Sequence, residues 1–115
     1  MMFGMTFEQG DIIVLPFPFT DLSSSKQRPA FVVSNRRFNL NSEDVIVCGI
    51  TSNLNNEKDS LVIDSESLSD GFIPVKSRIK VGKIFTLKQS LVRKKVAQVK
   101  KEIILGVKQK LSEIL

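Results

Sequence analysis

The chain has 115 residues, of which 42% are hydrophobic and 25% charged, and this balance excludes the charge-rich, apolar-poor class of disordered chains. Its length fits one domain over residues 1–115 with a single core. No apolar run approaches the roughly 20 residues needed to span a bilayer, and residues 1–11 lack the basic and apolar regions of a secretion signal, so we expect a cytoplasmic protein without a membrane segment.

The numbers of histidines and cysteines and the net charge limit the kinds of catalysis and binding that the chain can perform. The chain contains no histidine, which removes the commonest metal ligand and the commonest general acid or base at neutral pH. The single cysteine, Cys48, cannot form an internal disulfide, and we interpret it as a small buried side chain on a strand because no histidine is present to activate it. The net charge of +5 favours polyanionic partners without establishing that the protein binds nucleic acid.

Short apolar runs separated by polar segments predict strands in the first half of the chain. Residues 11–15 form such a run, which stops at a Pro-Phe-Pro sequence because proline cannot continue a central strand. Residues 19–27 have the composition of a polar loop, and residues 30–34 predict the next strand, followed by a polar connection at 36–43. Residues 44–51 are apolar on both faces and predict the longest and most buried strand.

The second half continues this pattern. We expect a short strand at residues 60–64, a polar connection at 65–71, and further strands at 72–75 and 78–87. Gly82 interrupts the last of these, which indicates a bulge or bend. Five or six short strands within about 85 residues are typical of a small barrel and not of alternating strands and helices.

The C-terminal segment has a different period. Its apolar residues recur at spacings of three and four, which predicts an amphipathic helix packed on the barrel: Ile103, Ile104, Val107, Leu111 and Ile114. Residues 95–99 fit either one last strand, which we favour, or an extension of this helix. The basic residues at 93–95, with Lys100 and Lys101, fit either an RNA-contacting face or an ordinary solvated surface, and we favour the surface.

Two motifs at the start of the chain carry a resemblance to a known family. Residues 10–21 read GDIIVLPFPFTD, and after a serine-rich loop residues 26–34 read KQRPAFVVS. In this order and spacing they resemble the MazF/PemK toxins of type II toxin–antitoxin systems. The resemblance continues through residues 45–52 and 77–87 and ends with the helix, so it covers essentially the whole chain.

This resemblance implies a fold, an activity and partners. The expected fold is mainly β, an SH3-like small barrel of the CcdB, Kid and PemK type with a C-terminal helix, and the expected assembly is a homodimer. The expected activity is that of an mRNA interferase, an endoribonuclease that cleaves single-stranded RNA with a sequence preference, using no metal and no cofactor. Attack by the ribose 2′-OH would leave a 2′,3′-cyclic phosphate and a 5′-OH. An antitoxin protein would block the site, and the toxin would meet DNA only through that antitoxin.

The same resemblance assigns two catalytic residues. Arg28, directly before a proline, matches the active-site arginine of the family, and a guanidinium offers a permanent fork of donors to the oxygens of a phosphorane-like transition state. Thr51, at the end of the buried strand, matches the catalytic threonine, whose hydroxyl would hydrogen-bond the scissile phosphate or the developing oxyanion.

Six further residues are candidates for substrate binding: Phe17, Phe19, Thr20, Lys26, Ser52 and Lys80. Because Phe17 and Phe19 alternate around a proline, one of them can stack on a base while the other enters the core, although two core phenylalanines are the plainer interpretation. Thr20 and its neighbour Asp21 can approach RNA or cap the loop, and we favour capping.

One segment departs from the family pattern. Where well-studied PemK-type members carry arginine and aspartate, this chain has Lys80 and Gly82. Lysine can still neutralise a phosphate as a point charge, but glycine cannot act as an acid or a base. A guanidinium stays protonated at neutral pH and is a poor general base, so Arg28 does not complete the mechanism and proton transfer stays unassigned.

Two other functions stay open on the same scaffold. A non-catalytic toxin, in the manner of the CcdB toxins, would act by binding a protein target, which the glycine at position 82 favours and which Arg28 and Thr51 argue against. A degenerate member of the family would only bind RNA or its antitoxin. Substitution of Arg28 separates these cases, because only the enzyme must lose activity while keeping its fold.

Overall fold

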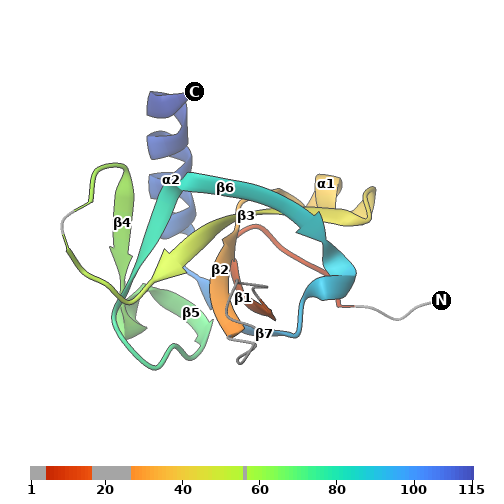
Figure 1. Ribbon diagram of the computed structural model, residues 1–115, viewed down its shortest axis with the longest axis horizontal. Helices are drawn as coiled ribbons and strands as arrows, with labels where there is room; N and C mark the ends of the chain where they lie inside the picture. The colour runs from red at the N-terminus through yellow and green to blue at the C-terminus, as the bar shows by residue number, and fades with distance from the viewer. Residues whose placement is uncertain (1–4, 17–26, 56) are drawn as a thin grey trace.

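The computed structural model describes residues 5–16, 27–55 and 57–115. In these ranges a seven-stranded antiparallel sheet, in the order β4-β6-β3-β2-β1-β7-β5, curls into a partly closed barrel with a C-terminal helix beside it (Figure 1). The strands are β1 (Asp11–Pro16), β2 (Gln27–Val32), β3 (Asp44–Thr51), β4 (Ser60–Ile63), β5 (Leu68–Gly71), β6 (Ser77–Lys88) and β7 (Lys94–Val99). The helices are α1 (Arg36–Leu40) and α2 (Lys101–Ile114), with 3-10 turns η1 (Ser65–Ser67) and η2 (Gln89–Leu91). The expected mainly β fold with a terminal helix is confirmed.

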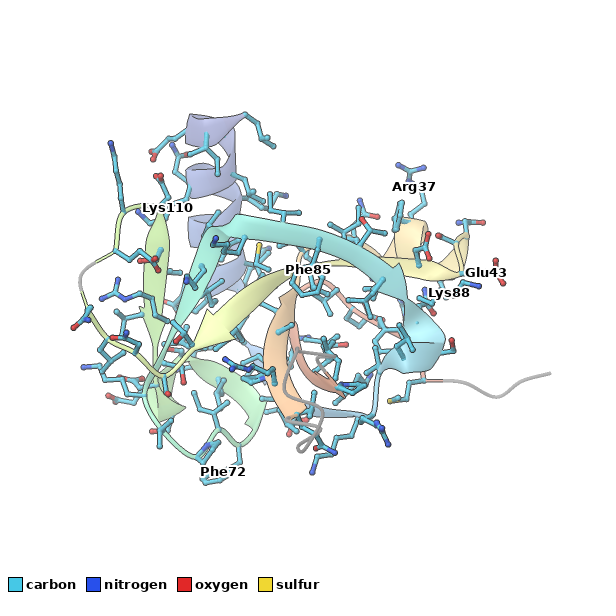
Figure 2. The ribbon with its side chains drawn as sticks, viewed as in Figure 1. Arg37, Glu43, Phe72, Phe85, Lys88 and Lys110 are labelled. Atoms are coloured by element: carbon cyan, nitrogen blue, oxygen red, sulfur yellow. The ribbon has the colours of Figure 1, made fainter. Side chains whose placement is uncertain are left out.

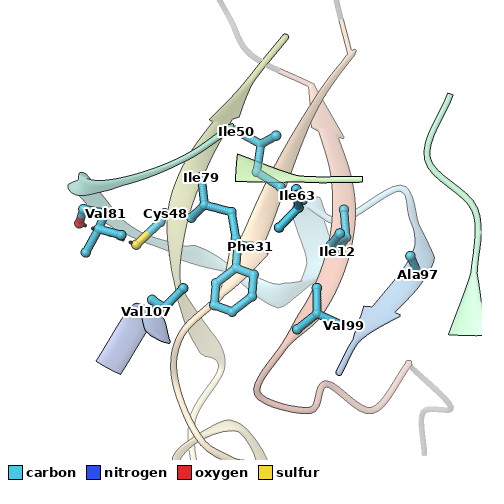
Figure 3. Close-up of a cluster of buried hydrophobic side chains, with 10 residues drawn as sticks. All are labelled: Ile12, Phe31, Cys48, Ile50, Ile63, Ile79, Val81, Ala97, Val99 and Val107. Carbon is cyan, nitrogen blue, oxygen red and sulfur yellow. Dashed lines mark hydrogen bonds between the residues drawn. The ribbon is translucent and has the colours of Figure 1, made fainter. Parts of the chain in front are cut away.

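Buried side chains form two clusters on opposite faces of the curled sheet. Successive residues of a strand point to opposite faces, so Ile12 belongs to the first cluster and Ile13 to the second. In the first cluster, shown in Figure 3, Phe31 lies among isoleucines and valines, and Val107 brings α2 onto the sheet. Strand β3 supplies both clusters, so residues 44–51 are apolar on both faces as expected. The prediction that they form the longest and most buried strand is wrong, because β6 is longer at 12 residues against 8, and a larger share of β1 is buried.

Cys48 is fully buried in the first cluster, as expected for a small apolar side chain. Its thiol donates a hydrogen bond to the Val81 carbonyl at 3.6 Å. Burial raises the pKa of this thiol to about 11, because the low-dielectric interior disfavours the thiolate. The cysteine is therefore a packing residue.

The Gly-Asp opening of the first motif ties β1 to β7 and to α2. Gly10 has a φ of +94°, and a Cβ at this position would lie 2.6 Å from Ile104 Cδ1 and 2.7 Å from Gln98 Oε1, so a side chain has no room. Asp11 is buried, and its carboxylate accepts hydrogen bonds from the Glu8 amide at 2.8 Å and from Gln98 Nε2 at 2.5 Å. Lys95 Nζ lies 3.6 Å from the same carboxylate. The motif is thus required for packing.

The irregularity expected at Gly82 is present as a wide bulge in β6. Cys48 of β3 pairs with Ile84, but the next residue, Gly49, pairs with Lys80, so three residues of β6 have no partner on β3. The bulge lets one long strand bend and pair with β3 along its length and with β4 at its first half (Figure 1).

The expectation of a plain polar connection at residues 36–43 is wrong in part, because this segment contains α1. The side chain of Asn35 accepts a hydrogen bond from the Phe38 amide at 2.9 Å and caps the helix. Asn39 is buried and bonded on both sides, accepting from Ser34 Oγ at 2.5 Å and donating to the Phe7 carbonyl at 3.0 Å. Tertiary contacts therefore make a helix of a segment that has little helical periodicity.

The strand expected at residues 72–75 is also wrong. The strand here is β5, within the segment 65–71 that we expected to be a polar connection, and it pairs with β7 at the edge of the sheet. Phe72 donates its amide to the Val96 carbonyl at 3.0 Å, and two residues later Pro74 has no amide to continue the ladder. The last strand, β7, confirms the favoured interpretation of residues 95–99, and α2 follows directly. None of the helices in the described ranges is long and apolar enough to cross a membrane.

Candidate functional site

The ends of β2 and β3 bring the two predicted catalytic residues side by side. Ala30 pairs with Gly49 in this antiparallel ladder, and the same register continued by two residues sets Arg28 opposite Thr51. Both side chains then lie on the same face, because residues directly opposite one another on neighbouring strands point to the same side of a sheet. On the other side of β3, Thr51 pairs with Arg78 of β6.

Two cavities open on this pair, one of about 680 Å³ and one of about 310 Å³. Arg28, Pro29, Ile50 and Thr51 line both of them and therefore form the ridge between the two. The larger cavity is otherwise mostly apolar and continues along the residues after β5, whereas the smaller one is bounded by β6.

The smaller cavity, which we call the cationic cavity, carries concentrated positive charge. Arg28, Lys80 and Lys83 all line it, and none of its described lining residues is acidic. Lys80 is partly buried, and its Nζ lies 3.5 Å from Glu57 Oε1, an ion pair that fixes the ammonium beside the cavity. Positive charges gathered in a hollow favour an anion, and Arg28 and Lys83 add to the charge of Lys80, which Glu57 balances in part.

Thr51 supplies a fixed hydroxyl at the ridge. The side chain is partly buried, and its Oγ1 accepts a hydrogen bond from the Asn53 amide at 3.1 Å. A hydroxyl that accepts one hydrogen bond retains its own O–H as a donor. The group is thus oriented by the backbone and able to donate to an anion.

Sequence reasoning missed Lys83, and the bulge explains why. In a regular strand, residues three apart point to opposite faces, so the pattern separates Lys83 from Lys80. The bulge resets the alternation, and the Lys83 Cβ comes to lie over Gly49, at 3.8 Å from the position of a Cβ built there. The glycine in the strand at 78–87 indicated the irregularity, but it did not indicate that Lys83 would come onto the same face as Lys80.

Arg78 was also missed, and it holds the segment that follows the ridge. Its Nη1 donates to Ser60 Oγ at 2.7 Å and its Nη2 to the Leu54 carbonyl at 3.3 Å. The guanidinium therefore connects β6 and β4 to residues just beyond Thr51. The alternation of Arg78 with Lys80 on one strand face was a signal that sequence reasoning did not use.

The other predicted residues have mixed outcomes. Ser52 is exposed and lines the larger cavity beside Thr51. Residues 93–95 are exposed as expected, but Lys94 also lines the larger cavity. Four candidates lie outside the described residues, together with Asp21: Phe17, Phe19, Thr20 and Lys26. Within the described ranges, no three Cys, Asp or Glu side chains come together as a metal-binding group.

The comparison with known families agrees with this arrangement. A family model described as PemK-like, MazF-like toxin of type II toxin–antitoxin system matches residues 8–115. The chain belongs to this PemK-like, MazF-like family. No curated protein sequence matches it.

Solved structures show that the fold is shared at low sequence identity. The MazE–MazF structure (Form-III) from Deinococcus radiodurans has a TM-score of 0.79 at 17% identity and covers 96% of both chains. A mycobacterial endoribonuclease has a TM-score of 0.74 at 18% identity, with 97% of this chain and 93% of the other covered. A mycobacterial endoribonuclease in complex with its cognate antitoxin has a TM-score of 0.72 at 18% identity, covering 92% and 91%.

In this PemK-like chain, position 82 carries a glycine where the sequence comparison above expects an aspartate, and the structure shows the surroundings of that glycine. Gly82 is exposed on the bulge, and a Cβ built there would have no neighbour within 4 Å. The glycine is therefore not required by packing. The carboxylate that the structure does bring to Lys80 is that of Glu57, from the segment between β3 and β4.

Proposed function

We propose that this chain is the toxin of a type II toxin–antitoxin pair and acts as an endoribonuclease on single-stranded RNA. The observation that carries the proposal is that Arg28 and Thr51 together line both cavities, one of which is the cationic cavity. Family membership supports it, and so do the fold neighbours from mycobacteria that are described as endoribonucleases.

In the proposed reaction the ribose 2′-OH attacks the adjacent phosphorus. The bond from phosphorus to the 5′ oxygen breaks, and the proton lost by the 2′-OH is balanced by the one gained by the leaving oxygen. The products are a 2′,3′-cyclic phosphate and a 5′-OH, with no water, metal or cofactor consumed. The attacking oxygen must come in line with the leaving oxygen, a geometry that an A-form duplex resists, so the substrate is single-stranded.

The residues of the site act mainly by stabilising charge. Arg28 donates two N–H groups to the non-bridging oxygens, on which negative charge gathers in the transition state. Thr51 donates its hydroxyl to the same phosphate, and Lys80 neutralises the phosphate or its neighbour as a point charge. Ser52 and the segment that contains Phe17, Phe19, Thr20 and Lys26 complete the proposed binding surface.

The structural neighbours also support a proposal about binding partners. The MazF protein of D. radiodurans was solved with MazE, and one mycobacterial neighbour with its cognate antitoxin. We propose that this chain likewise binds an antitoxin, acts in the cytoplasm and forms a homodimer. A second candidate function, a toxin that binds its target without cleaving RNA, is favoured by one observation, the absence of a carboxylate at position 82.

The test is incubation of the purified protein with a long single-stranded RNA in EDTA, followed by mapping of the fragment ends. We expect discrete cuts that leave 5′-OH ends, and their loss by at least about a hundredfold in the Arg28→Ala variant, because one preorganised donor to a developing oxyanion contributes about that much. Arg37→Ala is the matched control, since Arg37 is an exposed arginine on α1, on a different part of the molecule (Figure 2).

Circular dichroism shows whether each variant keeps its fold. Intact RNA across a panel of sequences with the wild-type protein would refute the nuclease and support the non-catalytic toxin. Equal cleavage by the wild type and the Arg28→Ala variant would instead refute the assignment of the site.

A further inference from the structure

Phe72 exposes most of its aromatic ring. Its exposed fraction is 68%, whereas Phe7 and Phe31 are 3% and 1% exposed and lie in the two cores. The ring stands at the rim of the molecule, just after β5 (Figure 2). A single exposed apolar side chain is common on proteins and indicates nothing by itself. Its backbone and its surroundings make this one different.

The backbone beneath Phe72 is held rigidly. Gly71 has a φ of +84°, and a Cβ there would lie 2.2 Å from the Val96 carbonyl oxygen and 2.5 Å from the Ala97 Cα, so only glycine allows this approach to β7. Phe72 itself donates its amide to the Val96 carbonyl at 3.0 Å. The ring is therefore presented from a fixed point of the sheet, and binding to it needs little ordering of the backbone.

Phe72 lines the larger cavity, which also contains the catalytic pair. The cavity has a volume of about 680 Å³ and reaches from Phe72 to Arg28 and Thr51. Between them its wall is apolar, and Val75, which follows Phe72 along the chain, is itself 52% exposed. An aromatic platform thus stands on the same hollow as the residues proposed to hold the phosphate.

The charge and the polar groups of this cavity fit a nucleotide. Its charged lining residues are Arg28 and Lys94, and among the described residues that line it none is acidic. Unpaired RNA bases are bound by stacking on aromatic rings while cations hold the neighbouring phosphates. Two exposed polar side chains in the same lining are available to the edge of a base, Gln27 and Ser52.

We propose that Phe72 is the stacking platform for an unpaired RNA base adjacent to the scissile phosphate. This inference rests on the proposed function and adds to it the subsite for a base. The phosphate lies at Arg28 and Thr51, and the neighbouring base enters the larger cavity and stacks on Phe72. Its edge then meets the polar side chains of the lining, which makes this subsite a determinant of sequence preference.

A tryptophan at position 72 gives a direct test of stacking. The chain contains no tryptophan, so Phe72→Trp creates a single fluorophore at the proposed subsite. The probe is a single-stranded RNA whose 2′-hydroxyls are methylated to prevent cleavage, with the same sequence as a duplex for comparison. We expect saturable quenching by the single strand and little quenching by the duplex. If fluorescence anisotropy shows that labelled RNA binds while the tryptophan signal stays constant, the inference is refuted.

Removal of the ring tests its contribution to the reaction. Stacking of one base contributes about 1–3 kcal/mol, so Phe72→Ala is expected to raise KM for RNA by roughly 5- to 150-fold and to leave kcat at saturation little changed. Phe72→Leu keeps the apolar volume without the aromatic face and should lose nearly as much. Leu40→Ala is the matched control, because Leu40 is 61% exposed on α1 and lines neither cavity.

The outcomes separate this inference from the proposed nuclease. Cleavage with an unchanged KM in Phe72→Ala refutes the base subsite and leaves the nuclease standing. Quenching of Phe72→Trp by the methylated RNA, together with no cleavage by the wild type of unmethylated RNA across the panel of sequences, supports the subsite and refutes the nuclease. Unchanged RNA binding in Phe72→Ala together with lost binding of the antitoxin assigns the ring to a protein contact and refutes the subsite.

Discussion

Lys80, Gly82 and Lys83 show how one irregularity of a strand determines which side chains reach a site. Without the bulge, Lys83 would point away from the face that carries Lys80 and Arg28. With it, three cations line one cavity, and the position between the two lysines is free of steric constraint. The bulge therefore concentrates charge at the site and leaves room for an additional side chain.

The open position at Gly82 leads to a prediction about proton transfer. Because a Cβ there meets nothing within 4 Å and the residue has no positive φ, Gly82→Asp should change the free energy of unfolding by no more than about 0.5 kcal/mol. A carboxylate two residues from Lys80 offers a further acid or base near the site, and general acid–base catalysis contributes about a hundredfold or more. We expect kcat for RNA cleavage to rise at least tenfold, measured in single-turnover assays.

The uncharged isostere Gly82→Asn is the control, since it has the same shape without the ability to exchange a proton at neutral pH. An equal increase in both variants would show that the gain comes from packing or hydrogen bonding. No increase in either would mean that proton transfer does not involve position 82.

Strand β1 packs against strand β7 and helix α2 at the Gly-Asp motif. Gly10 lets Ile104 of α2 approach the start of β1, and the buried Asp11 carboxylate joins β1 to Gln98 of β7. The first strand is thus held at a single point to the last strand and the terminal helix, although about 80 residues of the chain separate it from them. The Gly-Asp motif that carried the family resemblance has this packing as its physical cause.

A methyl group at this point should loosen all three elements together. Gly10→Ala forces a non-glycine residue to a φ of +94° and brings its Cβ within 2.8 Å of two Ile104 carbons, so we expect a loss of about 2–4 kcal/mol in the free energy of unfolding. Urea denaturation measures this loss. Gly82→Ala is the matched control and should be nearly neutral, and equal losses in the two variants would contradict the role assigned to Gly10.

Periodicity predicted some elements and not others for physical reasons. The strand at 44–51 was predictable from its nearly continuous apolar run. The terminal helix was predictable from the spacing of its apolar residues, most of which pack on the first cluster, although Ile114 at its end is exposed. β5 has the sequence LSDG and lies at the sheet edge, so it has no apolar pattern. α1 has a local cap from Asn35, but it also depends on the bond from Asn39 to the distant Phe7 carbonyl, which a local pattern does not reveal. In the site, the family motifs predicted Arg28 and Thr51. The positions of Lys83 and Phe72 could not be predicted, because the first depends on the bulge in β6 and the second on the close packing of Gly71 against β7.

On the scale of the whole molecule, the net charge of +5 matters mainly through its placement. Lysines occur on many elements, and Figure 2 shows Lys88 and Lys110 far from Phe72. Dispersed charge attracts RNA over a distance that shrinks with added salt, but only the cations that contact phosphates release counterions on binding. Overall basicity and the cationic cavity should therefore leave different signatures in the salt dependence of binding.

Two lysines on β6 allow this distinction to be measured. Lys83 lies in the middle of the strand and lines the cationic cavity, whereas Lys88 is exposed at the C-terminal end of the same strand and lines neither cavity. For single strands, each phosphate contact contributes about −0.7 to the slope of log K against log[salt], so Lys83→Ala should reduce the magnitude of the slope by roughly 0.7. Lys88→Ala should leave the slope unchanged, because removing a distant charge alters only the general field. Both slopes come from anisotropy titrations of a cleavage-resistant RNA at several salt concentrations. Equal slopes for the two variants would mean that RNA is held by the overall charge of the molecule and not by the cationic cavity.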